Sequence, residues 1–547
     1  MKKQDFELEG QIVDVIKKRI FPGKVSVSDG RITQISEEIV TAKHYILPGL
    51  VDAHIHVESS MLIPSEFARL AVVHGTVATV SDPHEIANVL GIPGVMFMIR
   101  NGRKVPFKFN FGASSCVPAT TFETAGAALG VEEITSLLSM PEILYLSEMM
   151  NFPGVLYGDA EVKAKLDVAK RLGKPIDGHA PGLRGEDAKR YIEAGISTDH
   201  ECFTKPEALD KLNFGMKILI REGSAAKNFE ALCSLIDEYP EMVMLCSDDK
   251  HPNDLAEGHI NQLIVRALAK GFDFMNVIRS CTFNPVTHYQ LPVGLLQAGN
   301  PADIIVVDNL KGFHVKATYV DGILVAENGK TLINSVAELP SNHFNADPLE
   351  REAIKVPDSR GDIRVIKALD GQLITETLRF SPKISNGLVI ADPDRDILKL
   401  VVRNRYNHAP PAIGFVSGFG LKQGAIASCV AHDSHNIVAV GADDNSITRA
   451  INLIISSKGG ISIVEGDHEM SIPLPFAGIM SDQDGYGIAQ LYEQMDEWTK
   501  RLGSSLRAPY MTLSFMALLV IPDLKLSDKG LFDGEKFAFT SLFWQNI

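Results

Sequence analysis

The feature that most constrains the fold is a regular alternation of short aliphatic runs with helix-like stretches, which begins near residue 43. Eight runs rich in aliphatic and β-branched residues recur, and most are followed by a polar residue or a histidine and then by a stretch rich in Ala, Lys, Glu and Leu. The runs occupy residues 46–57, 76–80, 107–111, 143–146, 175–177, 196–198, 216–220 and 242–246. Helices are expected between most of them, for example at 65–74, 160–172, 185–194 and 226–239.

Strands that alternate with helices pair in parallel, and eight such units in about 250 residues fit a closed (β/α)₈ barrel. The competing interpretation is an open doubly wound sheet, which usually carries a glycine-rich turn after its first strand. Here the first run ends in DAHIHVESS, without a GxGxxG or GxxxxGK[ST] pattern. The sequence therefore favours the TIM-like barrel.

Two further regions flank the predicted barrel. Short alternating strand patterns occupy residues 7–42 and recur after Gly299, which indicates one small β domain built from both ends. A polar, proline-bearing stretch over residues 339–361 is typical of a linker. We predict three domains: a small β domain at 1–45 plus 299–338, the barrel at 46–298, and a C-terminal α+β domain at 345–547.

Charge and cysteine usage narrow the function class. The sequence has 53 Lys and Arg against 68 Asp and Glu, a net charge of −15, and this diffuse acidic balance disfavours nucleic-acid binding. The N-terminus lacks the apolar core of a secretory signal, and the apolar stretch 511–521 is about half of the ~20 residues that a membrane span needs. Six scattered cysteines without a CxxC pair fit reduced thiols. We therefore predict a cytoplasmic protein that binds neither nucleic acid nor membrane.

Histidines and carboxylates recur at the ends of the predicted strands. Side chains at i and i+2 of a strand project to one side, so His54 and His56 in DAHIH can bind one ion, although an H-x-H pair alone is weak evidence. Ligand-type residues at later strand ends are Glu148, His179, His200 and Asp248. Because barrel active sites lie at the carboxyl ends of the strands, all six side chains are expected to converge on one mouth.

Four imidazoles and two carboxylates offer only nitrogen and oxygen donors, which suits Mn(II), Fe(II) or Zn(II). Six ligands exceed the need of one tetrahedral ion, so a two-metal site fits, with Glu148 as the natural bridge. Such a site lowers the pKa of water toward ~7 and yields a hydroxide nucleophile at neutral pH. For Glu148 or Asp248 taken alone, a strand-end cap or an ion pair is the alternative interpretation.

Longer motifs in this order resemble a known family. LPGLVDAHIHVESS, the barrel histidines with Asp248, and TFNPVTHYQL…GLLQAGNPADIIVVD resemble the amidohydrolase superfamily. Within it, DAHIHVESSM, SDPHEIANV, YLSEMMNFPGV, GHAPGL, STDHE and CSDDKHP resemble the bacterial adenine deaminases, and the third domain is similar to the C-terminal domain of those enzymes. Glu148 stands where many relatives carry a carboxylated lysine.

The resemblance implies hydrolysis of adenine to hypoxanthine and ammonia in purine salvage, with Mn²⁺ or Fe²⁺ in a binuclear site and with a homodimeric assembly. We expect Asp248 to take the proton of the attacking hydroxide and to relay it. His84 and Glu85 in SDPHE are candidates for purine binding or a second proton transfer, with a turn that feeds a capped helix as an equal alternative. Glu201 is a candidate for substrate binding, or an acid that faces away behind the ligands or on the surface.

Two other functions stay open at this point. One is a hydrolase of another cyclic amide or amidine, such as a dihydroorotase-like or cytosine-deaminase-like enzyme. The other is a catalytically dead barrel that serves as a binding or assembly scaffold, which has no need of the six-ligand set. In the third domain, His432 and His435 in AHDSHNIVAVGADD precede an apolar strand, and we interpret them as a structural turn rather than as pocket-closing residues.

Overall fold

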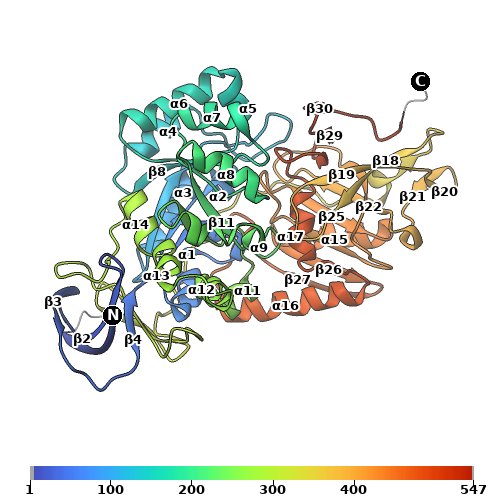
Figure 1. The fold of residues 1–547 in the computed structure, drawn as a ribbon. Helices are drawn as coiled ribbons and strands as arrows, with labels where there is room; N and C mark the ends of the chain where they lie inside the picture. Colours follow the sequence, from blue (N-terminus) through green and yellow to red (C-terminus); the bar gives the residue numbers. More distant parts are fainter. Residues whose placement is uncertain (1–4, 545–547) are drawn as a thin grey trace.

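The computed structural model describes residues 5–544 and places the barrel between a β-sheet at one side and the C-terminal region at the other (Figure 1). Strands from before and after the barrel share one eight-stranded sheet, in the order β16-β15-β14-β13-β4-β1-β2-β3. The bounds are β1 Phe6–Asp14, β2 Arg19–Ser28, β3 Arg31–Glu37, β4 Tyr45–Pro48, β13 Ile304–Val307, β14 Val315–Val320, β15 Ile323–Glu327 and β16 Lys330–Thr331.

The barrel consists of eight strands that pair in parallel in two sheets, β5-β6-β7-β8-β9 and β10-β11-β12. Backbone hydrogen bonds close both seams: Ser197 N donates to Ile176 O (2.9 Å), and Asp248 N donates to His54 O (2.9 Å). The predicted TIM-like barrel is therefore confirmed. The bounds are β5 Leu50–Ile55, β6 Thr76–Ser81, β7 Lys108–Ala113, β8 Ile143–Met149, β9 Ile176–Gly178, β10 Thr198–Asp199, β11 Lys217–Arg221 and β12 Val243–Cys246.

One expected strand and one expected helix are wrong in detail. The run at 46–57 is two strands, because the chain leaves the small sheet at Pro48 and Gly49 packs too closely on Val77 for any side chain there. The single helix expected at 226–239 is two short ones, because Asn228 exchanges backbone and side-chain hydrogen bonds with Arg221 and holds the preceding residues out of the helix.

Helices follow most barrel strands and cover the barrel (Figure 1). Several begin at a side-chain cap; for example, Asp159 accepts hydrogen bonds from the first backbone amides of α6. The helices are α1 Pro64–Ala71, α2 His84–Leu90, α3 Ile92–Gly102, α4 Val131–Leu138, α5 Phe152–Tyr157, α6 Ala160–Arg171, α7 Gly185–Glu193, α8 Lys205–Asn213, α9 Phe229–Leu232, α10 Leu235–Glu238, α11 Pro252–Glu257, α12 Ile260–Ala269, α13 Phe274–Ser280 and α14 Phe283–Tyr289, with 3-10 turns η1 Val57–Ser60 and η2 Val72–His74.

The C-terminal region is built on a second eight-stranded sheet, in the order β19-β18-β23-β22-β25-β24-β26-β27. Helix α15 buries Ile447, Ile451 and Ile454, and backbone bonds between Ser481 and both Met61 and Ile63 join this region to the barrel. The bounds are η3 Arg351–Ile354, β17 Val356–Pro357, β18 Ile363–Ala368, β19 Thr375–Phe380, β20 Lys383–Ser385, β21 Leu388–Ile390, η4 Pro393–Arg395, β22 Leu398–Arg403, β23 Ala412–Ser417, β24 Ala425–Ser428, β25 Ile437–Gly441, α15 Asp444–Ser457, β26 Ile461–Glu465, β27 His468–Ile472, α16 Gly485–Arg501, α17 Pro509–Phe515, β28 Leu524–Ser527, β29 Gly530–Asp533 and β30 Ala538–Phe539.

Two further expectations concern membranes and thiols. Among the described residues, each helix is too short or too polar to cross a bilayer. All six cysteines are buried and free of disulfides, as the scattered spacing predicts.

Candidate active site at the barrel mouth

The six predicted ligands meet at the carboxyl ends of five barrel strands, and all are buried. His54 is the last residue but one of β5 with His56 just beyond the strand, and Glu148 lies near the end of β8. His179 and His200 directly follow β9 and β10, and Asp248 lies two residues beyond β12. Strands fix these positions because a parallel barrel gathers all its carboxyl ends on one face.

One group of donors forms around His54 and His56. Their Nε2 atoms lie 3.3 Å apart, and Asp248 Oδ1 lies 3.6 Å from His54 Nε2 and 3.2 Å from His56 Nε2. His56 Nδ1 lies 3.1 Å from the carbonyl oxygen of Asp82, which can only accept, so the ring proton resides on Nδ1. The Nε2 lone pair of His56 is thereby aimed at the space that the other two ligands also face.

Glu148 joins this group to a second one. Its Oε1 lies 3.2 Å from His56 Nε2, whereas its Oε2 lies 2.7 Å from His179 Nδ1 and 3.2 Å from His200 Nε2. Burial alone would raise the pKa of Glu148, but the charge and hydrogen bond of His179 outweigh burial and hold that pKa well below its ordinary value. An ionised carboxylate with one oxygen toward each group is the arrangement that a bridging ligand requires.

The donor set fits divalent metal ions. Two groups of three of these side chains, His54 with Glu148 and His200, and His54 with His56 and Asp248, place ligand atoms within 4.8 Å of one another. His54 Nε2 and His179 Nδ1 face the other donors, and the opposite ring nitrogens, His54 Nδ1 and His179 Nε2, are buried without a hydrogen-bond partner. Nitrogen and oxygen donors suit Mn²⁺, Fe²⁺ or Zn²⁺.

Sequence reasoning missed Arg221, the last residue of β11. Its guanidinium, wholly buried, donates from Nη1 to Asp248 Oδ2 (2.6 Å) and forms a two-pronged ion pair with Glu201. Burial would raise the pKa of Asp248, but Arg221 outweighs it and keeps that pKa well below its ordinary value. The strand-end rule that selected Asp248 applies equally to Arg221. The surface alternative for Glu201 is wrong, because Glu201 is buried beside His200.

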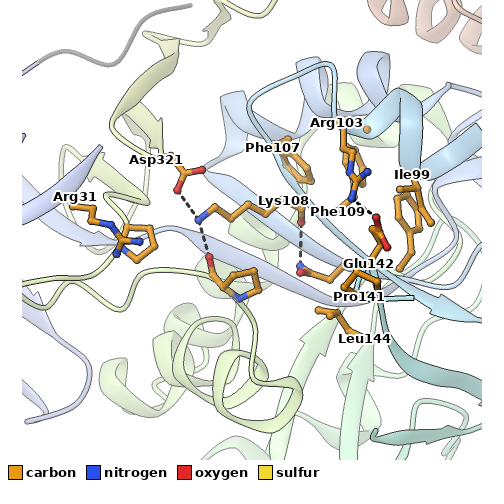
Figure 2. A pocket seen from close by; sticks show the side chains of 15 residues that line it. Arg31, Ile99, Arg103, Phe107, Lys108, Phe109, Pro141, Glu142, Leu144 and Asp321 are labelled. Atoms are coloured by element: carbon orange, nitrogen blue, oxygen red, sulfur yellow. Dashed lines mark hydrogen bonds and ion pairs between the residues drawn. The ribbon is translucent and has the colours of Figure 1, made fainter. Parts of the chain in front are cut away.

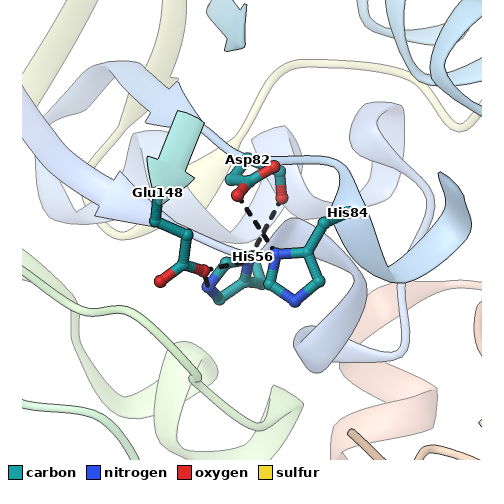
Figure 3. Close-up of side chains that lie close together, drawn as sticks. All are labelled: His56, Asp82, His84 and Glu148. Carbon is teal, nitrogen blue, oxygen red and sulfur yellow. Dashed lines mark hydrogen bonds and ion pairs between the residues drawn. The ribbon is translucent and has the colours of Figure 1, made fainter. Parts of the chain in front are cut away.

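Asp82, also missed, lies between the second strand and His84. Figure 3 shows the rings of His56 and His84 beneath its carboxylate, with Glu148 beside them. Asp82 Oδ2 lies 3.1 Å from His84 Nδ1, and its Oδ1 accepts from Ser114 and Ser147. The strand-end signal for Asp82 is present in the SDPHE motif.

The C-terminal region supplies the far wall of the site. Glu85 Oε1 accepts a hydrogen bond from His432 Nδ1, and Glu85 Oε2 lies in close contact with His435 Nε2. His84 Nε2 lies 3.2 Å from Glu85 Oε1 and 3.4 Å from Asp433 Oδ1. Residues 432–434 do form a turn. The pocket-closing interpretation that the sequence analysis set aside fits His432, which lines the cavity and bonds the barrel residue Glu85, 347 positions earlier, whereas His435 does not line it.

A small cavity of about 20 Å³ lies between the two walls. A far larger cavity, of about 440 Å³, opens near the amino-terminal ends of β7 and β8, on the side of the barrel away from the predicted ligands (Figure 2). Most of its charged groups are paired, since Lys108 bonds Asp303 and Asp321 and Arg103 bonds Glu142, while Arg31 donates to the carbonyl oxygen of Gly299. The small cavity is lined by His56, His84, Glu85, Glu148, Met150, His179, His200, Glu201, Asp248, Asp249, Leu373, His432, Asp433, Phe515 and Leu518.

Comparison with known proteins agrees with this arrangement. Residues 45–325 match the Amidohydrolase family, and residues 372–538 match the Adenine deaminase C-terminal domain. An adenine deaminase of Sulfurovum sp. (strain NBC37-1) is 57% identical over 97% of this chain and 99% of its own length. An adenine deaminase of Methanosarcina acetivorans is 54% identical over 98% of this chain and 99% of its own length. A dihydroorotase of known structure is 16% identical, with a TM-score of 0.45 over 60% of this chain and 100% of its own. By the two family matches and these full-length relatives, the chain belongs to the amidohydrolase family, in its adenine deaminase group.

Proposed function

We propose that this chain is a metal-dependent hydrolase that converts adenine to hypoxanthine and ammonia and serves purine salvage. The observation that carries the proposal is Glu148, which faces one donor group with each carboxylate oxygen. Full-length similarity to proteins named adenine deaminase supports the substrate. A non-catalytic scaffold would not need this buried, charged cluster, because burying charged groups costs free energy unless they bind ions or substrate.

The proposed cofactor is a pair of Mn²⁺ or Fe²⁺ ions. His54, His56 and Asp248 would hold one ion, His179 and His200 the other, and Glu148 both. When bound, the ions would lower the pKa of water and so supply a nucleophile near neutral pH. The all-nitrogen and oxygen donor chemistry supports this assignment.

Two proton movements fall to the side chains of this chain. Both protons of the attacking water must move: the first ends on the nitrogen that departs from C6 as ammonia, and the second on N1 of the product ring. Arg221 engages only Asp248 Oδ2, so Oδ1 stays directed into the site and would take the first proton. His84 and Glu85, 3.2 Å apart on the barrel side of the cavity, would bind the purine and deliver the second. Glu201 lines the cavity beside them and stays a prediction as a substrate contact.

The cavity dimensions imply movement between the walls. About 20 Å³ has room for one or two water molecules, and a purine is several times larger. Adenine therefore enters when the C-terminal wall of Leu373, Phe515 and Leu518 moves away from the barrel, and closure around it excludes water.

The function is tested with enzyme produced with added Mn²⁺ and protected from air. We expect loss of the adenine absorbance band, release of ammonia, and two metal ions per chain. A panel with cytosine, dihydroorotate and other cyclic amides separates adenine deaminase from the other amidohydrolase reactions. The homodimer, the cytoplasmic location and the three domain boundaries stay predictions.

A further inference from the structure

Lys525, in β28 of the C-terminal region, is wholly buried, although its side chain lies in no ion pair within residues 5–544. Its Nζ donates to two backbone oxygens, those of Leu373 (2.6 Å) and Phe515 (3.0 Å). Burying an amine without a counter-ion is costly, and a space-filling role would be met by methionine or leucine at no such cost. The two hydrogen bonds therefore require an explanation beyond packing.

Both acceptors belong to the far wall of the active-site cavity. Leu373 lies in the loop between β18 and β19, and Phe515 is the last residue of α17, yet both side chains line the cavity. The last carbonyls of a helix lack partners within the helix, and Lys525 supplies one for Phe515. The neighbouring residue strengthens the same junction, since Leu526 N donates to Met516 O (3.0 Å).

The wall fixed in this way also touches the catalytic face. The ring of Phe515 stacks on His432, with centroids 5.6 Å apart, and His432 bonds Glu85 of the barrel. Ser514 Oγ accepts a hydrogen bond from the backbone amide of His432 (3.1 Å). A shift of the α17 end would thus move both the apolar wall and the turn that meets Glu85.

We propose that Lys525 is a positioning residue for the substrate pocket, which sets the spacing of the Leu373 and Phe515 segments against the purine ring. The proposal rests on the proposed function only for the identity of the substrate. Lys525 touches no reacting atom. It acts through the two wall segments that contact the purine, so its main effect falls on substrate binding, and proton transfer is affected only to the extent that the turn at Glu85 moves with the wall.

The test compares Lys525→Met with a matched control, Lys399→Met. Lys399 is equally buried in the same region and donates to Ile354 O (2.9 Å) and Asp444 Oδ1 (2.5 Å), but it lines no part of the cavity. We expect Lys525→Met to raise KM for adenine about tenfold, the effect of losing two hydrogen bonds of roughly ordinary strength, with kcat and metal content nearly unchanged. Lys399→Met should lower thermal stability and leave KM unchanged.

A second readout does not depend on turnover. Hydrogen exchange of residues 369–375 and 511–519 should accelerate in Lys525→Met and not in Lys399→Met. A double variant, Lys525→Met with Leu373→Ala, should raise KM by less than the product of the single effects, because both changes act on one wall. If Lys525→Met does not accumulate as folded protein, Lys525→Arg is used instead. Its guanidinium can still donate hydrogen bonds to Leu373 and Phe515 but is larger and displaces the wall, so the same rise in KM is expected.

The results separate two failures. Absence of adenine turnover in the unmodified enzyme overturns the proposed function, and Lys525 is then judged by exchange and by KM for whichever panel compound is hydrolysed. Unchanged KM in both Lys525 variants, or an equal rise in KM in Lys399→Met, overturns the positioning role.

Discussion

The two halves of the active-site cavity are built differently. The barrel half consists of ionisable donors at strand ends, and backbone bonds hold them in place; Asp248, for example, bonds His54 and His56 through its main chain. The C-terminal half consists of Leu373, Phe515 and Leu518 with a polar turn, carried on loops and a helix end. On the proposed function, the metal ligands and polar purine contacts belong to the barrel half and the apolar surface against the purine belongs to the C-terminal half, so substitutions in the two halves should change metal content and KM separately.

The largest effect is expected from Glu148→Gln on the barrel half. The variant keeps the size of the side chain but loses a charge and one oxygen ligand, so metal content should fall and kcat/KM should drop by about 10⁴-fold or more. Glu142→Gln is the control, because Glu142 precedes the opposite end of the same strand and pairs with Arg103. Metal content and kcat/KM are measured on the same preparation of the variant. Full metal content together with the rate of the unmodified enzyme would show that Glu148 does not bridge two ions.

Asp248→Asn tests proton transfer within the same half. The amide keeps one oxygen for a metal and cannot accept a proton at neutral pH, so kcat should fall by about 10² to 10⁴-fold while metal at His54 and His56 is largely kept. Metal stoichiometry and kcat are measured with and without excess Mn²⁺. Recovery of nearly the full rate on adding Mn²⁺ would show that Asp248 is a ligand only.

A smaller effect is expected from His435→Gln on the C-terminal half. His435 Nε2 packs against Glu85 Oε2 but lines no part of the cavity, so its loss should lower kcat/KM by about tenfold through a displaced Glu85, with metal content unchanged. His408→Gln, at an exposed position in the same region, is the control. If metal were lost in proportion to rate, the separation between the two halves would not hold.

The smallest effect concerns stability rather than rate. Burial lowers the pKa of Lys525 to about 7, with Asp523 opposing, against an ordinary value of 10.5. Between these values the unfolded chain carries a proton that the folded chain lacks, so Lys525 makes stability rise with pH by up to about 1.4 kcal/mol per unit, and its contribution is constant below pH 7. Thermal unfolding from pH 7 to 10 should therefore show a steeper rise for the unmodified protein than for Lys525→Met. Parallel curves would mean that Lys525 stays charged.

Most of the barrel half was predictable from the sequence, because its logic is local. Short aliphatic runs specify strands, their alternation with helices specifies parallel pairing, and the residue after each run must then lie at one mouth. That reasoning located His54, Glu148 and Asp248, and a stricter use of it would have included Asp82 and Arg221. The two errors of detail, at 46–57 and 226–239, arise where contacts with other segments override local propensity.

The sequence alone therefore determined the barrel and the residues that ring its mouth, since both depend on periodicity along neighbouring residues. Only the tertiary structure decided what faces them. His432 meets Glu85 across 347 residues, and Lys525 joins segments about Leu373 and Phe515 that share no periodic signal. Such contacts arise from the packing of whole elements on one another, and a turn or a buried lysine has the same sequence pattern whether it closes an active site or merely completes a core.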